Sequence, residues 1–192
     1  MKKTVVLIVV ILVAVFWGAR IYNGFVNSDE IVSNAWAKVE SDYQRRADLI
    51  PNLVETVKGY AAHEKETYQA VVEARANATK IQLNVDELTE ENLQKFQAAQ
   101  SELNSALSRL IAVSENYPEL KANENFLELQ AQLEGTENRI KESRNKYNSA
   151  VKEYNVGVRK FPKSIIASIF GFSTKAAFEA DADAQKAPEV KF

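Results

Sequence analysis

The sequence predicts an all-α protein: an N-terminal single-pass transmembrane helix followed by an antiparallel up-down helical bundle of three long helices and a short fourth. Three observations indicate this class. Residues 5–19 form an unbroken apolar run, and three later segments repeat apolar residues every three or four positions, as one face of a helix does. Only six glycines and four prolines occur in 192 residues, which is few for the turns of a sheet-rich fold.

The chain divides into three parts by composition. Residues 1–27 form the anchor and its flank, residues 28–179 the helical bundle, and residues 180–192 a tail that we expect to be disordered. The formal net charge of −2, from 24 basic and 26 acidic side chains, offers no broad basic surface, so we expect no nucleic-acid partner. The absence of cysteine excludes disulfides, thiolate metal sites and a thiol nucleophile.

The apolar N-terminal run has the length of a membrane span. As a helix, residues 4–22 cover about 28 Å, close to the roughly 30 Å hydrocarbon core of a bilayer. A cleaved secretory signal shares the basic start and the apolar core. Cleavage after Ala19, however, would place Trp17 at the third-last position, where a small residue is needed. We therefore predict an uncleaved anchor, and the basic residues before it favour an N-in orientation with the bundle outside the cytoplasm.

The first stripe of apolar residues predicts a long helix that begins near Ile31. Pro51 falls inside it and removes one backbone donor, so we expect a kink there. The stripe keeps its phase across the proline, which favours a kink over a reversal of the chain, and the pattern ends near residues 77–84. The members of the stripe are Ile31, Ala35, Val39, Tyr43, Ala47, Ile50, Val54, Val57 and Ala61.

Two further stripes predict two more long helices. One begins after Asp86 or Thr89, either of which can cap a helix, and the other ends at Pro162. Short connections make such helices antiparallel neighbours with coiled-coil-like packing. The apolar residues 165–172 predict a short fourth helix that closes the end of the bundle. The seam residues are Leu93, Phe96, Gln100, Leu103, Leu107, Leu110 and Ser114 in the second helix, and Phe126, Leu129, Leu133, Thr136, Ile140, Ser143, Tyr147, Val151, Tyr154, Val158 and Phe161 in the third.

The most specific motif in the chain is residues 45–54, Arg-Arg-Ala-Asp-Leu-Ile-Pro-Asn-Leu-Val. Together with Ala35-Trp36, residues 57–64 and Tyr147-Asn148, it resembles the signature of the LemA family. The resemblance implies a small bacterial membrane-anchored protein with an N-terminal span and a helical bundle. It implies no established biochemical activity and defines no catalytic residues.

A cluster of polar residues surrounds the proline of the first helix: Arg45, Arg46, Asp48 and Asn52. On a helix they are neighbours within two turns. One hypothesis is that the guanidinium groups of Arg45 and Arg46 bind carboxylates of a protein partner. The alternative, which we favour, is a polar layer that satisfies the backbone carbonyl freed by Pro51 and fixes the register between helices.

A second polar set lies on the third long helix. Tyr147-Asn148 and Tyr154-Asn155 repeat seven residues apart, and Arg144 precedes the first pair by one turn. This spacing puts both tyrosines on one seam and both asparagines beside it. Asparagines in such positions usually specify register, and the alternative is a ligand site between helices.

The sequence supplies no constellation for catalysis, a cofactor or a metal. His63 is the single histidine, and Thr67 stands where a metalloprotease helix would carry its second histidine. We therefore predict a non-enzymatic scaffold or adaptor, anchored by residues 4–22 in a bacterial cell membrane, whose bundle binds a protein partner. One alternative is a metal-dependent accessory enzyme that uses His63. Another is a sensor with a ligand cavity lined by Tyr147, Asn148, Tyr154 and Asn155.

Overall fold

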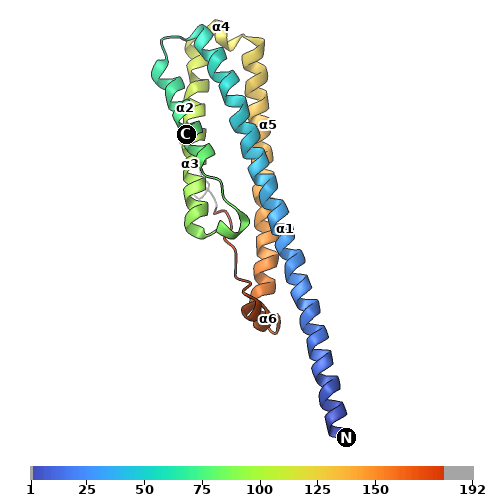
Figure 1. The fold of residues 1–192 in the computed structure, drawn as a ribbon. Coiled ribbons are helices and arrows are strands. Elements are labelled where there is room, and N and C mark those ends of the chain that lie inside the picture. The colour runs from blue at the N-terminus through green and yellow to red at the C-terminus, as the bar shows by residue number, and fades with distance from the viewer. Residues whose placement is uncertain (1, 180–192) are drawn as a thin grey trace, which may run out of the picture.

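The computed structural model describes residues 2–179 (Figure 1). Every regular element among these residues is a helix, which confirms the all-α class. The predicted tail, residues 180–192, lies outside the described residues.

One helix, α1 (Lys2–Tyr60), contains both the apolar N-terminal run and the first predicted stripe. Its first part projects away from the rest of the molecule (Figure 1). The large side chains of the apolar run are exposed there. Pro51 lies inside α1, so the chain does not reverse at the proline, as predicted. The members of the predicted stripe are buried from Val39 onward, whereas Ala35 is half-buried and Ile31, the predicted first member, is exposed.

The chain reverses at residues 61–64, and α2 (Lys65–Lys80) runs back along α1. The sequence predicts instead that the first helix continues to about residue 77, and this prediction is wrong. The break is hidden because the helical period continues beyond it, with Val71, Ala74 and Ala78 buried like the residues before the turn. The bundle therefore gains a short helix that the stripes do not reveal.

The two remaining long helices agree with the predicted stripes. α3 (Glu90–Val113) begins after Thr89, whose hydroxyl oxygen accepts a hydrogen bond from the N–H of Asn92. α5 (Glu124–Arg159) begins after Asn123, which caps it in the same way. The short elements between the long helices are η1 (Val85–Glu87), η2 (Ser114–Asn116) and α4 (Pro118–Lys121).

The core contains two large apolar clusters with Arg46 buried between them, and a third, small cluster joins Ile21 and Phe25 of α1 to Ala167. The distal cluster, farther from the N-terminus, joins α1, α2, α3 and α5. The proximal cluster joins α1, α3, α5 and the end of the described chain. Successive bundle helices alternate in direction (Figure 1). The largest fully buried side chains are Phe126, Ile50 and Leu53 in the distal cluster and Trp36 and Tyr147 in the proximal cluster.

α6 (Lys163–Phe170) is the predicted short C-terminal helix, and it lies beside the last part of α5 and the stretch of α1 from Gly18 to Phe25 (Figure 1). Ala167 is its one buried residue. Phe161, predicted on the core seam, is 76% exposed just before this helix. The exposed apolar side chains of this region are Phe161, Ile165, Ile169 and Phe170.

Residues 172–179, the C-terminal segment, turn back along α5. α6 ends at Gly171, whose φ of 78° lies in the left-handed region that glycine adopts readily. From there the segment runs without helical structure and places Phe178 in the proximal cluster. No apolar period in the sequence marks this segment, because it is extended and contributes a single large apolar side chain to the proximal cluster.

Candidate functional site

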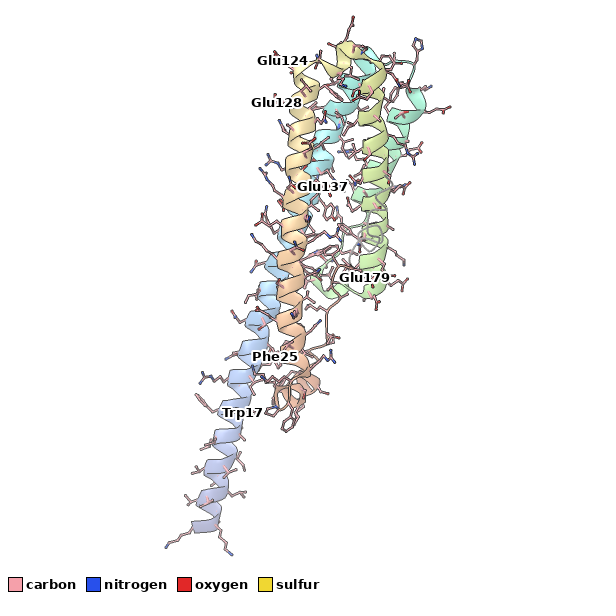
Figure 2. All side chains as sticks on the ribbon, turned by 180° about the vertical axis from the view of Figure 1, so that it is seen from behind. Trp17, Phe25, Glu124, Glu128, Glu137 and Glu179 are labelled. Atoms are coloured by element: carbon pink, nitrogen blue, oxygen red, sulfur yellow. The ribbon has the colours of Figure 1, made fainter. Side chains whose placement is uncertain are left out.

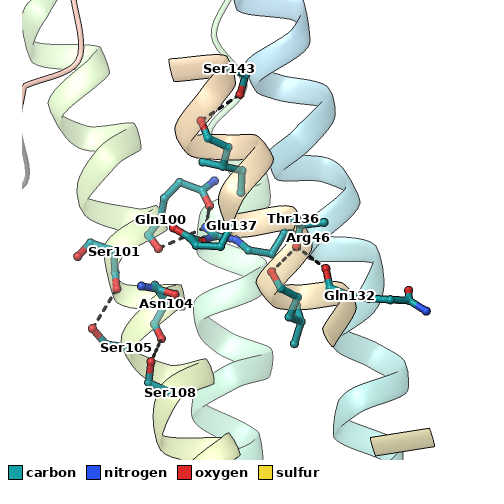
Figure 3. Close-up of polar contacts among 12 residues, drawn as sticks. Arg46, Gln100, Ser101, Asn104, Ser105, Ser108, Gln132, Thr136, Glu137 and Ser143 are labelled. Carbon is teal, nitrogen blue, oxygen red and sulfur yellow. Dashed lines mark hydrogen bonds and ion pairs between the residues drawn. The ribbon is translucent and has the colours of Figure 1, made fainter. Parts of the chain in front are cut away.

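The middle of the bundle holds a buried arginine. The side chain of Arg46, which is 4% exposed, donates from Nη2 to Oε1 of Gln100 at 2.6 Å and from Nη1 to Oε2 of Glu137 at 3.0 Å (Figure 3). Arg46 therefore connects α1, α3 and α5 at one level. A shift of any of these helices would leave a buried cation without its acceptors, so the contact opposes changes of register.

The other three members of the predicted polar cluster do not join this layer. Arg45, Asp48 and Asn52 are exposed on α1. Asp48 accepts a hydrogen bond from Gln44 of the same helix at 2.7 Å. The structure thus separates Arg46, which faces the core, from three residues that face outward.

The backbone carbonyl freed by Pro51 is satisfied by a residue that sequence reasoning missed. Proline has no N–H, so the carbonyl of Ala47, four residues earlier, lacks its helical donor. Nε of Arg75, on α2, donates to that carbonyl at 2.8 Å. No sequence signal could have found this contact, because the unpredicted turn at residues 61–64 brings Arg75 back to α1.

Two asparagines of α5 bind the backbone of the C-terminal segment. The amide nitrogen of Asn148 donates to the carbonyl of Phe178 at 3.0 Å, and its oxygen accepts from the N–H of Phe178 at 2.9 Å. Asn155 binds the carbonyl and the N–H of Lys175 in the same way, both at 2.8 Å. The hydroxyl of Tyr147 donates to the carbonyl between them, that of residue 176, at 2.8 Å.

Phe178 fills an aromatic pocket. Its ring, 5% exposed, lies 6.0 Å from the ring of Trp36 and 5.5 Å from that of Tyr147, measured between centroids. The guanidinium of Arg144 lies 4.7 Å from the centre of the same ring, and its Nη2 donates to the carbonyl of Glu179 at 3.2 Å. The segment is therefore held by one buried side chain as well as by its backbone.

Lys175 occupies a second side-chain site. Its Nζ lies 2.8 Å from Oδ1 of Asp29 on α1 and 5.5 Å from the ring centre of Tyr154. Burial, and then the charge of Asp29, raises the pKa of Tyr154 to about 12, and burial also raises the pKa of Tyr147. Both hydroxyls therefore stay protonated at neutral pH. The surface that binds the segment, called the α5 groove, consists of Asp29, Trp36, Phe96, Arg144, Tyr147, Asn148, Tyr154 and Asn155.

The contacts of the two asparagines correct the sequence-based interpretation. The structure does bring Tyr147, Asn148, Tyr154 and Asn155 together, and residues 175–178 bind against all four, while the two asparagines also border an open pocket. The sensor hypothesis places an open ligand cavity there. The asparagines bind an extended chain, and among the described residues they form no side-chain hydrogen bond to a neighbouring bundle helix that would set register.

His63 lies in the exposed turn between α1 and α2, at the end of the bundle away from the apolar run. In the part of the chain that the structure describes, no three or more histidine, aspartate or glutamate side chains gather in a way that could hold a metal ion. The metal-dependent hypothesis for His63 therefore gains no support from the geometry.

The opposite end of the molecule is apolar and basic. Among the described helices, α1 alone is long and apolar enough to cross a membrane, and none of its most apolar window, with a mean hydropathy of 2.6, is buried. A pocket of about 690 Å³ opens where the apolar run ends, between α1, α5 and α6, with Trp17 and Phe25 on its α1 side (Figure 2). Arg20, Lys160 and Lys163 also line this pocket.

These features define a class of helical-bundle proteins in which one long N-terminal helix with an apolar start continues into the bundle. The chain belongs to the LemA family, whose family model matches residues 35–192. This match confirms the resemblance recognised in the motif at residues 45–54.

Three relatives illustrate the family. Magnetosome protein MamQ 1 of Paramagnetospirillum magneticum is 26% identical over 175 residues, which cover 82% of this chain and 64% of the relative. Magnetosome protein MamQ of Magnetospirillum gryphiswaldense is 26% identical over 168 residues, covering 79% and 62%. Protein LemA of Metamycoplasma hominis is 22% identical over 158 residues, covering 82% and 68%. The chain thus spans slightly less than two thirds of the length of the two MamQ relatives.

Proposed function

We propose that this chain is a membrane-anchored, non-catalytic scaffold or adaptor that presents its helical bundle for protein–protein interaction. The observation that carries the proposal is the continuity of α1, which holds the apolar run and also contributes Trp36 and Ile50 to the core. A continuous helix sets a fixed distance and direction, which a flexible linker does not. Residues 23–60 measure about 57 Å at the usual rise of the helix, so the far end of the bundle stands that far from the membrane.

The surroundings of the apolar run support membrane placement. α6 packs on α1 at the end of the run, where Ile166 lies beside Gly18 and the rings of Tyr22 and Phe170 are 4.9 Å apart. The exposed apolar side chains of α6 therefore lie level with this end of the run, next to the basic pocket. An apolar helix face beside basic side chains suits the bilayer interface and its phosphates. The basic residues at the start of the chain favour N-in, with the bundle outside the cytoplasm of a bacterial cell.

The use of the buried polar groups supports a non-catalytic role. Arg46 is engaged by two other helices, and the buried carboxylate of Asp42 accepts a hydrogen bond from Lys38 at 2.7 Å. The hydroxyl of Tyr147 is engaged by the C-terminal segment. These groups hold helices and the segment in place.

Photocrosslinking in the cells that produce this protein tests the proposal. A photoreactive residue is placed singly at Arg45, His63, Lys152 or Ile169, all of which are exposed on different faces. Val10, in the apolar run, serves as the lipid-facing control. We expect one protein to be captured reproducibly from a single face of the bundle. Capture of lipid alone from every position would sink the scaffold proposal.

A further inference from the structure

We propose that the α5 groove is a binding site for an extended peptide segment of a partner protein, and that the C-terminal segment of the chain occupies this site in cis. The partner's segment carries a basic residue at the position of Lys175 and an aromatic residue three positions later, at that of Phe178. This inference rests on the scaffold function proposed above and defines the chemistry of the partner.

The spacing of the two asparagines matches the rise of an extended peptide. Asn148 and Asn155 are seven residues apart, which is about 10.5 Å along a helix. They bind Phe178 and Lys175, and an extended chain covers about 10 Å over three residues. The segment runs antiparallel to α5, since its later residue binds the earlier asparagine. On the side of the segment these contacts use backbone atoms only, so they fit any extended sequence without proline at the two bound positions.

Side-chain contacts determine which sequences fit best. The pocket around Phe178, built from aromatic rings with a guanidinium over the ring, favours an aromatic residue. Asp29 favours a basic residue at the other site. Between these two sites, Ala176 is half-buried, so its position favours a small residue. Ala177 is exposed, so its position tolerates many residues. Backbone contacts for affinity and side-chain pockets for specificity are the general mode of extended-peptide recognition.

The geometry allows one segment to be exchanged for another. The walls of the groove belong to α1, α3 and α5, which also pack together in the distal cluster without the segment. Within residues 175–179, the backbone hydrogen bonds of the segment go to side chains of the bundle, and none pairs with the backbone of a helix. An open pocket of about 600 Å³ borders Asn148, Asn155 and Ala177, so a competing peptide can approach these contacts from solvent.

The C-terminal segment acts as an intramolecular competitor. Residues 171–174 alone connect its first bound residue to α6, so its effective concentration at the groove is on the order of millimolar or above. A peptide in trans binds only the molecules whose own segment has left the groove, so its apparent affinity is its intrinsic affinity multiplied by the fraction of such molecules. A change that weakens the segment therefore increases binding in trans.

The test uses the full chain in detergent and a fluorescent peptide with the sequence of residues 172–179, Phe-Ser-Thr-Lys-Ala-Ala-Phe-Glu, followed by fluorescence anisotropy. We expect the Phe178→Ala chain to bind this peptide at least about tenfold more tightly than the unmodified chain does, because its own segment competes less. Lys175→Glu, which opposes Asp29, shifts affinity in the same direction and serves as a second release variant.

Matched groove variants decide whether binding occurs at the site proposed. In the Phe178→Ala background, Asn148→Ala together with Asn155→Ala abolishes binding of the peptide. Asn145→Ala, a change of the same size on the exposed face of α5, leaves binding unchanged. A peptide in which alanine replaces the second phenylalanine binds at least about tenfold more weakly, because the aromatic pocket stays empty.

Three results would overturn the proposal. The peptide could fail to bind either release variant although circular dichroism shows both folded, or its binding could survive the loss of both asparagines. A dimer of the full chain that depends on Phe178, seen by light scattering, would show that the occupant is a second copy. Crosslinking in cells tests the scaffold function, whereas peptide binding in detergent tests the groove. Loss of crosslinking with retained peptide binding would therefore contradict the scaffold function alone.

Discussion

Arg75 supplies the hydrogen bond that Pro51 cannot give to the backbone carbonyl of Ala47. The guanidinium of Arg75 donates to the carbonyl of Ala47 at 2.8 Å, and Pro51 is the residue that leaves this carbonyl without its helical donor. A proline in a helix interior costs about 3 kcal/mol, partly because of that lost hydrogen bond. α2 thus supplies the hydrogen bond that α1 lacks at the proline, and this contact requires the turn at residues 61–64.

Removal of this donor should destabilise the bundle. Arg75→Ala leaves the carbonyl of Ala47 unsatisfied, and we expect the free energy of unfolding to fall by about 1 to 3 kcal/mol, measured by urea unfolding in detergent. Pro51→Ala restores the helical N–H, so Arg75→Ala should cost clearly less in that background. Equal costs in both backgrounds would show that Arg75 stabilises the bundle by other contacts.

The buried arginine should matter more than its exposed neighbour. Arg46→Ala removes hydrogen bonds to Gln100 and Glu137, and we expect it to lower the free energy of unfolding by about 3 kcal/mol. Arg46→Met should cost less, because it retains an apolar side chain and leaves no buried charge. Arg45→Ala should stay within about 0.5 kcal/mol of the unmodified chain. A cost at Arg45 as large as that at Arg46 would contradict the assignment of the polar layer.

The tyrosines of the α5 groove should make stability depend on alkaline pH. Tyr154 has a pKa of about 12 in the folded chain against an ordinary value of 10.0, because of burial and the charge of Asp29. A raised pKa gives stability that is complete below the unfolded value and is lost as pH rises through the folded value. The free energy of unfolding should therefore fall between about pH 10 and about pH 12. Tyr154→Phe should reduce this fall in urea titrations, and an unchanged slope would contradict the interpretation.

The apolar face of α6 should contact lipid. The chain has no cysteine, so a fluorophore can be attached at a single introduced one. A label at Ile169→Cys, a position 68% exposed, should be quenched by a quencher on lipid tails in nanodiscs. A label at Val72→Cys, which is 51% exposed on α2, should not. Equal quenching at the two positions would contradict the placement of α6 at the membrane interface.

Most of the long helices follow from sequence periodicity. All seven seam residues predicted for the second stripe are buried on α3 or just after it, and Thr89 caps that helix as proposed. Such predictions succeed because a buried helix face imposes a period of three to four residues on the sequence itself. The all-α class and the extent of α1 through Pro51 depend on this local signal.

The features that the sequence did not reveal depend on contacts between distant residues. The turn before α2 carries no break in the apolar period, and the contact of Arg75 depends on that turn. Asn148 and Asn155 stand out by their spacing, but the residues that they bind lie in an extended segment without any period. Two asparagines seven residues apart on a helix are equally compatible with setting helix register and with binding a peptide. Only the hydrogen bonds of both side-chain amides distinguish these two roles.

Quantitative photocrosslinking at Lys152 tests the central claim most directly, because this exposed residue lines the pocket beside the C-terminal segment. The yield of captured protein in native membranes is compared for three chains: unmodified, Phe178→Ala, and Phe178→Ala with Asn148→Ala and Asn155→Ala. We expect one protein to be captured, with a several-fold higher yield from Phe178→Ala and none from the chain that also lacks both asparagines. Equal yields from all three chains, or no protein captured from any of them, would contradict a membrane-anchored module that binds its partner through the α5 groove.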